Sequence, residues 1–161
     1  MRNIIDRVTE ILTSSLMIIM VIAACWQVFT RFVLNSPSTV SEEFLRYSLI
    51  WLTMVGAANA YGKKKHLAVI FIARKFPDKI QMLINLLVEV IVLLFSIILI
   101  LGGTKAFQNA VGQVSSALGM PMEYLYLSLP VGGVLFLFYS LINIAEHFKR
   151  NKLVAQAQER K

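Results

Sequence analysis

Long uncharged apolar stretches dominate this chain and restrict what it can fold into. Residues 11–30 and 124–145 contain no Asp, Glu, Lys or Arg, and residues 44–62 and 80–104 contain one each, Arg46 and Glu89. Because a helix rises about 1.5 Å per residue, roughly 20 apolar residues cross a hydrocarbon core of about 30 Å. The four stretches predict an all-α integral membrane protein with four transmembrane helices, in a single domain covering residues 1–161.

Composition excludes other classes of protein. Hydrophobic residues make up 57% and charged residues 16% of the 161 residues, whereas soluble domains carry about 25% charged residues. A soluble globule of this size could not bury so much apolar surface, and disorder requires low hydrophobicity. The single cysteine, Cys25, excludes an internal disulfide and a cysteine-based zinc site, and we interpret it as a small buried hydrophobe.

The distribution of basic residues predicts the orientation. With four spans, the N-terminus, residues 63–79 and the tail from residue 149 share one side and hold thirteen Lys and Arg residues. The other side holds three, Arg31, Arg46 and Lys105. Basic loops stay cytoplasmic, so both termini are expected there. The net charge of +7 is then explained by the orientation in the membrane and by attraction to anionic lipid, and nucleic acid is not expected as a partner.

Three segments outside the spans have open interpretations. Residues 67–73 form an apolar run that is too short to cross, so it is either an interfacial segment or an extension of the second helix. Residues 105–120 carry one charge and face outward in this topology, as a contact surface for an external partner or as an ordinary connection. The short cytoplasmic tail, residues 149–161, is expected to extend the last helix.

The second span opens with the chemistry of a helix start. Thr39 and Glu42 have the spacing of a capping box, and Ser41 is an alternative cap. Glu42 and Glu43 lie where a helix N-terminus favours negative charge, and Glu42 reaches Arg46 one turn later. These charges either cap and anchor the helix or contact another subunit.

The middle of the same span carries small residues at helical spacing. Thr53, Gly56, Ala57 and Ala60 would form a groove that permits close approach of another helix, in this chain or in a partner. Trp51 lies nearby, and we interpret it as a packing or interfacial-belt residue.

Glu89 calls for an explanation because it lies inside a predicted span. It is nine residues from the inner end of the 80–104 stretch, hence about 14 Å deep, where an acid costs a few kcal/mol. Arg46 would lie about 11 Å away in depth. Glu89 is therefore protonated, hydrogen-bonded within the bundle, or directed at another subunit, and the last is our sharpest hypothesis.

No catalytic or cofactor motif can be assembled. His66 and His147 lie on separate segments, and the chain has no metal-spaced cluster, Gly-rich phosphate loop or nucleophile elbow. With one buried acid and no polar path, the chain is poorly equipped to carry a solute alone. We expect neither an enzyme nor a cofactor.

The order of these features resembles the small membrane subunit of tripartite ATP-independent periplasmic (TRAP) transporters, the DctQ-like family. The resemblance covers nearly the whole chain. Two departures are Val40-Ser41, where the family often has a tryptophan, and Val69-Ile70, where an acid is common. The matching residues are Arg31, Glu42, Glu43, Arg46, Trp51, Gly56, Ala57, His66, Pro121, Tyr126, Pro130 and Gly132.

The resemblance implies a division of labour in a bacterial inner membrane. A large DctM-like membrane subunit would hold the substrate and sodium sites and move them elevator-fashion, and a periplasmic substrate-binding protein would deliver an organic acid, sialic acid or a C4-dicarboxylate. The small subunit would enlarge the fixed scaffold of the large one. The candidate subunit-interface residues are Glu42, Glu43, Arg46, Trp51, Gly56, Ala60 and Glu89.

Two rivals belong to other classes. A four-helix membrane enzyme of the glutathione-transferase type would fit the size and charge, but it needs an arginine cluster on the cytosolic side, and Arg46 lies on the other side. A small multidrug exporter would also have four spans. Its membrane acid normally lies in the first span and its chain is shorter, so Glu89 does not match.

Overall fold

The computed structural model describes residues 2–36, 38–63 and 78–159. Within these ranges the regular structure is helical, which confirms the all-α prediction. The run 67–73 and His66 lie outside the described residues. The helices are α1 (Arg2–Phe32), α2 (Thr39–Gly62), α4 (Asp78–Ala110), α5 (Glu123–Tyr126) and α6 (Ser128–Glu159).

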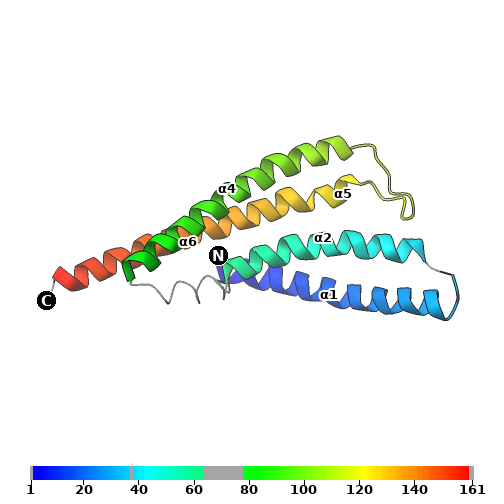
Figure 1. Cartoon of the computed structure of the whole chain (residues 1–161), viewed down its shortest axis with the longest axis horizontal. Helices are drawn as coiled ribbons and strands as arrows, with labels where there is room; N and C mark the ends of the chain where they lie inside the picture. The colour runs from blue at the N-terminus through cyan, green and yellow to red at the C-terminus, as the bar shows by residue number, and fades with distance from the viewer. Residues whose placement is uncertain (1, 37, 64–77, 160–161) are drawn as a thin grey trace.

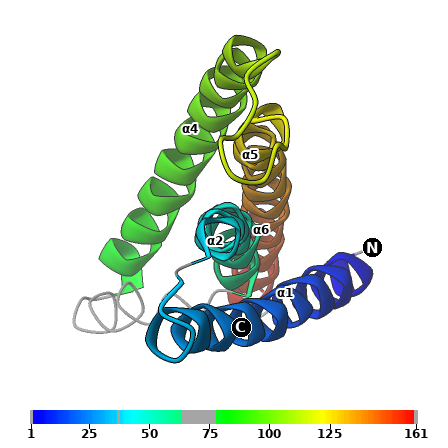
Figure 2. The same cartoon turned by 90° about the vertical axis from the view of Figure 1, so that its right-hand side faces the viewer.

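The helices pack as two antiparallel hairpins joined side by side (Figure 1). One hairpin is α1 with α2, the other is α4 with α5 and α6, and α2 packs against α6. The order across the molecule is therefore α1, α2, α6, α4, and α2 lies between α1 and α6 (Figure 2). This open row of helices leaves much of α1 and α4 uncovered within the chain.

Three predicted spans each lie within one helix, the span 124–145 covers α5 and the first part of α6, and the long helices extend further than the spans. Helix α1 begins nine residues before residue 11, and α4 continues to Ala110. The connection predicted to face outward, residues 111–122, which we call the outer connection, therefore begins at residue 111 and not at residue 105. Helix α6 continues to Glu159, as expected for the tail. Charges stop a membrane span without stopping a helix, since helix hydrogen bonds are made by the backbone. The helix ends therefore lie beyond the predicted ends of the spans.

Three helical stretches of the described residues are long and apolar enough to cross a membrane: Ile4–Phe32, Leu86–Ala110 and Glu123–Ala145. Helix α2 is not among them. Its first turns contain Glu42, Glu43 and Arg46, and Asn59 is buried near its other end. A helix covered by protein on two sides needs less apolar surface than one that faces lipid. Composition alone therefore supports three of the four predicted spans.

Glycines permit the closest helix approaches. A Cβ atom on Gly103 of α4 would lie 2.8 Å from the backbone nitrogen of Pro130, and one on Gly133 of α6 would lie 3.1 Å from that of Ile100. Gly62 plays the same part for α2, because a Cβ there would lie 2.4 Å from the ring of Tyr139 on α6. Close approach through small residues is the usual way in which membrane helices associate.

Helix α1 packs on α2 through one stripe. The Thr13 hydroxyl donates to the Thr9 carbonyl at 2.8 Å, and its methyl carbon would lie 3.9 Å from a Cβ built at Gly56 of α2. Cys25 lies off the stripe and is exposed, so its interpretation as a buried residue was wrong. The residues of the stripe, buried or half-buried, are Thr9, Thr13, Leu16, Met20, Ala24, Gln27 and Thr30.

Candidate functional site: polar contacts at both ends of the helix row

Glu89 has its partners inside the chain. The Tyr61 hydroxyl of α2 donates to the Glu89 carboxylate. The Ser140 hydroxyl of α6 lies 3.2 Å from the Glu89 carbonyl oxygen and 3.4 Å from its carboxylate. Both partners are buried, and Glu89 itself is half-buried. Of the three alternatives for this acid, the structure has the one in which it is hydrogen-bonded within the chain.

The depth predicted for Glu89 was wrong. Its partner Tyr61 lies in the last turn of α2, immediately before Gly62 and Lys63. Lys63 forms an ion pair with Glu10 of α1 at the same end. The first turns of α4 extend past the end of the α1–α2 hairpin (Figure 1), so counting depth from residue 80 overestimated it. Glu89 therefore lies at the level of the end of α2, far from the middle of the row.

A second polar contact joins α1 to α6 at this end. The Tyr139 hydroxyl donates to Oδ1 of Asp6 at 2.7 Å, and Tyr139 is 1% exposed. Together with the Glu89 contacts it forms a polar cluster, defined as Asp6, Tyr61, Glu89, Tyr139 and Ser140. The cluster links all four long helices, so it holds the two hairpins together.

The opposite end is joined by Glu43. Its Oε2 accepts the backbone N–H groups of Ala117 and Leu118, each at 2.9 Å. The hydrogen bond from the Ser115 hydroxyl, with these two N–H groups and the charge of Arg46, outweighs partial burial and lowers the pKa of Glu43 below its ordinary value. Glu43 thus anchors the outer connection to the start of α2.

The predicted capping box is absent. The N-cap of α2 is Ser38, whose hydroxyl oxygen accepts the Ser41 N–H at 3.3 Å. The helix begins one residue earlier than Thr39 would allow as a cap. Glu42 instead pairs with Arg46 at 3.2 Å, as predicted, with the two side chains 60% and 68% exposed. An exposed pair of this kind stabilises a helix very little.

Trp51 is a packing residue with one specific bond. Its indole N–H donates to the Tyr124 carbonyl oxygen at 3.1 Å, which joins α2 to α5. The bond spans 73 positions of sequence, so no local pattern could reveal it.

One face of α2 remains open along its whole length. The exposed residues recur every three or four positions, so they form a single stripe, which we call the open stripe of α2. Gly56 lies beside it and faces Thr13 of α1, with 3.9 Å between the Thr13 methyl carbon and a Cβ built at Gly56. The open stripe consists of Glu42, Arg46, Leu49, Thr53, Ala57 and Ala60.

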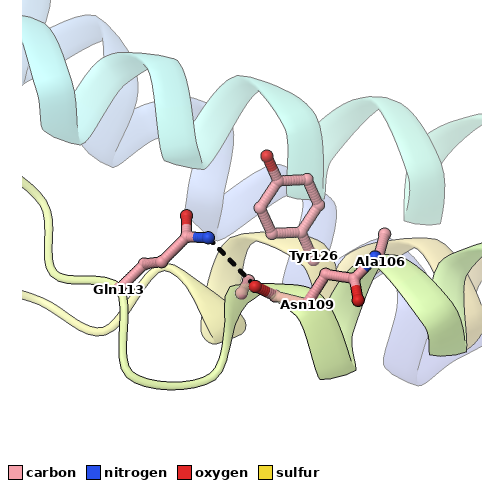
Figure 3. A pocket seen from close by; sticks show the side chains of 5 residues that line it. Ala106, Asn109, Gln113 and Tyr126 are labelled. Carbon is pink, nitrogen blue, oxygen red and sulfur yellow. Dashed lines mark hydrogen bonds between the residues drawn. The ribbon is translucent and has the colours of Figure 1, made fainter.

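A polar hollow of about 240 Å³ lies beside the outer connection (Figure 3). The Gln113 side-chain amide, which donates to the Asn109 carbonyl oxygen at 2.9 Å, and the Tyr126 ring line it together with Ala106 and Ala110. These groups offer amide and phenol hydrogen bonds without a charge. Among the described residues no three His, Cys, Asp or Glu side chains gather as metal ligands would.

Comparison with known proteins points in one direction. The family model described as "Tripartite ATP-independent periplasmic transporters, DctQ component" matches residues 20–150. The chain is 35% identical over 145 residues to the sialic acid TRAP transporter small permease protein SiaQ of Vibrio cholerae, covering 89% of this chain and 83% of that protein.

A second relative is much longer. The sialic acid TRAP transporter permease protein SiaT of Haemophilus influenzae is 26% identical over 126 residues, which are 78% of this chain but 20% of that protein. Both relatives are named as TRAP transporter permeases. The two rival interpretations, a glutathione-transferase type enzyme and a multidrug exporter, gain no support.

Proposed function

The chain belongs to the DctQ family, the small membrane component of tripartite ATP-independent periplasmic transporters, and from this premise we propose that it serves sodium-driven uptake of sialic acid. The observation that carries the substrate is the 35% identity to a small permease named for sialic acid, over 83% of its length. A C4-dicarboxylate is the competing substrate of the same transporter class.

The proposed partner is a large permease, with a periplasmic protein delivering the substrate. In the SiaT relative a segment similar to this chain makes up 20% of a longer polypeptide that is itself named a permease, which supports a working position beside a larger membrane protein. The polar groups of the described residues join helices to one another, which supports a structural role for this chain in the transporter. The chain would enlarge the fixed scaffold against which the larger subunit moves.

We propose that α2 also spans the inner membrane, so that the chain has four spans and cytoplasmic termini. The alternation of the four long helices supports this: the end of α2 and the beginnings of α1 and α4 lie at one end of the row, and residues 33–36 and 111–122 lie at the other (Figure 1). A cysteine probe at Gln113 should react with an impermeant reagent from outside, and one at Lys64 should not. The reverse pattern would contradict the orientation.

The open stripe of α2 is the proposed contact with the large permease. Glu42 and Arg46 lie at one end and Ala60 lies at the other. Between them Thr53 and Ala57 are small and Leu49 is the one large apolar member, so the stripe as a whole suits protein better than lipid. The other candidate residues have neighbours in their own chain: Gly56 faces α1, and Glu43 and Trp51 hold the outer end together. For Glu89 the bonds to Tyr61 and Ser140 favour a structural role over the interface role.

Uptake by reconstituted vesicles tests the function. Vesicles with this chain, the large permease, the periplasmic protein and an inward sodium gradient should accumulate labelled sialic acid, and excess unlabelled succinate should not compete. Vesicles with this chain alone should accumulate none. Uptake by the lone chain, or full uptake without it, would contradict the subunit role, and competition by succinate would contradict the substrate.

A further inference from the structure

The outer connection is a small hairpin whose tip has few partners of its own. The Ser115 N–H donates to the Met120 carbonyl at 2.9 Å and the Met122 N–H to the Gln113 carbonyl at 2.9 Å. Gly112 and Gly119 supply positive φ angles of 82° and 66° at its two bends, where residues with a side chain would be strained. These bonds define the base of the hairpin, while at its tip the backbone N–H groups of Ala117 and Leu118 point at α2.

The tip is held from outside by Glu43. A single carboxylate oxygen accepts two successive N–H groups, of Ala117 and Leu118, both at 2.9 Å. The Leu118 N–H also lies 3.3 Å from the Ser115 hydroxyl oxygen, and Ser115 is buried. Successive N–H groups that converge on one point form a concave site for an anion. Residues 111–122 contain no charged side chain, so the anion has to come from another element.

We propose that Glu43 is a positioning residue, a latch that holds the outer hairpin in one conformation against the start of α2. The hairpin carries Gln113, which lines the polar hollow, and exposes Val114 and Met120 on its outer side. Under the proposed function this surface faces the periplasm, where the substrate-binding protein acts. The latch would therefore fix the shape of the surface that the small subunit presents there.

The neighbouring acid has no part in the latch. Successive helix positions point about 100° apart, and Glu42 accordingly lies on the open stripe with Arg46. The charged side chain that acts on Glu43 is Arg46, on its own helix, and the hairpin contributes only N–H and hydroxyl groups. The same contacts lower the pKa of Glu43, so the latch stays charged and closed over the whole neutral range.

Amide hydrogen exchange in the assembled complex, prepared with the full chain and the large permease, tests the latch. A hydrogen bond to a charged group is worth roughly tenfold or more in an opening equilibrium. Glu43→Ala should therefore speed exchange at Ala117 and Leu118 by about tenfold or more, and Glu43→Gln by less, because its amide oxygen still accepts. Glu42→Gln makes the same change of charge one position away and should leave both amides within about twofold of the unaltered chain.

The exchange rates at these two amides decide the proposal independently of transport. Unchanged rates in Glu43→Ala, or equal acceleration in Glu42→Gln, would overturn the latch even if uptake proceeds as proposed. If Glu43→Ala speeds amide exchange throughout α4 and α6, the fold itself is disturbed and Glu43→Gln becomes the deciding variant. Faster exchange confined to the hairpin in Glu43→Gln would support the latch, and unchanged exchange rates in the hairpin would refute it. A failure of sialic acid uptake would refute the proposed function and leave the latch standing.

Discussion

Two adjacent glycines of α4 offer a matched test of how the helices pack. A Cβ atom on Gly103 would lie 2.7 Å from Cδ and 2.8 Å from the backbone nitrogen of Pro130, and 2.8 Å from Cβ of Leu129. A Cβ on Gly102 would meet nothing within 4 Å. The atoms that block Gly103 belong to a proline ring and to backbone, which cannot rotate away. Gly103→Ala therefore has to push α4 and α6 apart, whereas Gly102→Ala does not.

The two substitutions should change the free energy of unfolding in opposite directions. Replacing glycine by alanine inside a helix stabilises it by about 0.5–1 kcal/mol. Overpacking costs typically about 1–3 kcal/mol. Gly102→Ala should therefore stabilise the chain by up to about 1 kcal/mol, and Gly103→Ala should destabilise it by up to about 2.5 kcal/mol after the helix gain is subtracted.

Thermal unfolding of the two variants in the same detergent, followed by circular dichroism, measures the difference. The helix gain is the same in both variants, so they differ by the overpacking cost of about 1–3 kcal/mol. For a chain of this size each kcal/mol shifts Tm by about 2–4 °C, so the variants should differ by roughly 2–12 °C, with Gly103→Ala lower. Equal Tm values, or a higher Tm for Gly103→Ala, would refute the close α4–α6 contact.

Three further predictions concern the polar contacts. Tyr61→Phe removes the hydroxyl that donates to the Glu89 carboxylate and should lower the free energy of unfolding by about 1.5–3 kcal/mol. In a Glu89→Leu background the same substitution should cost much less, and an equal cost in both backgrounds would exclude the contact. Trp51→Phe should cost about 1 kcal/mol through the lost bond to the Tyr124 carbonyl, measured by thermal unfolding, and no change would exclude that bond. Because the pKa of Glu43 is lower in the folded chain, the folded chain favours the charged carboxylate. The stability that Glu43 contributes should therefore be fully present above its ordinary pKa of 4.5. It should be lost as the pH falls through the lower pKa of the folded chain. Unfolding of the unaltered chain and of Glu43→Gln, compared from pH 7 to pH 3, should converge only in acid, and convergence at neutral pH would contradict the latch.

The helices could be predicted from the sequence because apolarity and helix formation are properties of consecutive residues. The interaction of Glu42 with Arg46 was predictable for the same reason, since the partners are one turn apart. The ends of the helices were harder to predict from the sequence. A span ends where charge begins, but a helix continues through charges, as α4 does from Lys105 to Ala110.

Contacts between distant segments could not be predicted. For Glu89 a hydrogen bond within the chain was one of three open alternatives, and its partner was not identified because only charged residues were considered as specific partners and its depth was counted from residue 80. Tyr61, an uncharged aromatic residue 28 positions away, supplies the bond. A tyrosine in the last turn of a neighbouring antiparallel helix was the available signal. Glu43 was expected to cap and anchor its own helix or to contact another subunit, whereas it accepts hydrogen bonds from Ala117 and Leu118 of its own chain. These partners are backbone groups, which carry no sequence signature.

Affinity purification from membranes tests the central claim, that this chain works as the small subunit of a larger permease. The tagged chain and an untagged large permease, co-expressed and extracted in mild detergent, should leave the affinity column together and elute from size exclusion in one peak. Ala60→Trp, which fills the open stripe of α2, should reduce the amount of permease recovered, whereas Gly102→Ala should not. Recovery of the tagged chain alone, with all of the permease in the unbound fraction, would contradict the account.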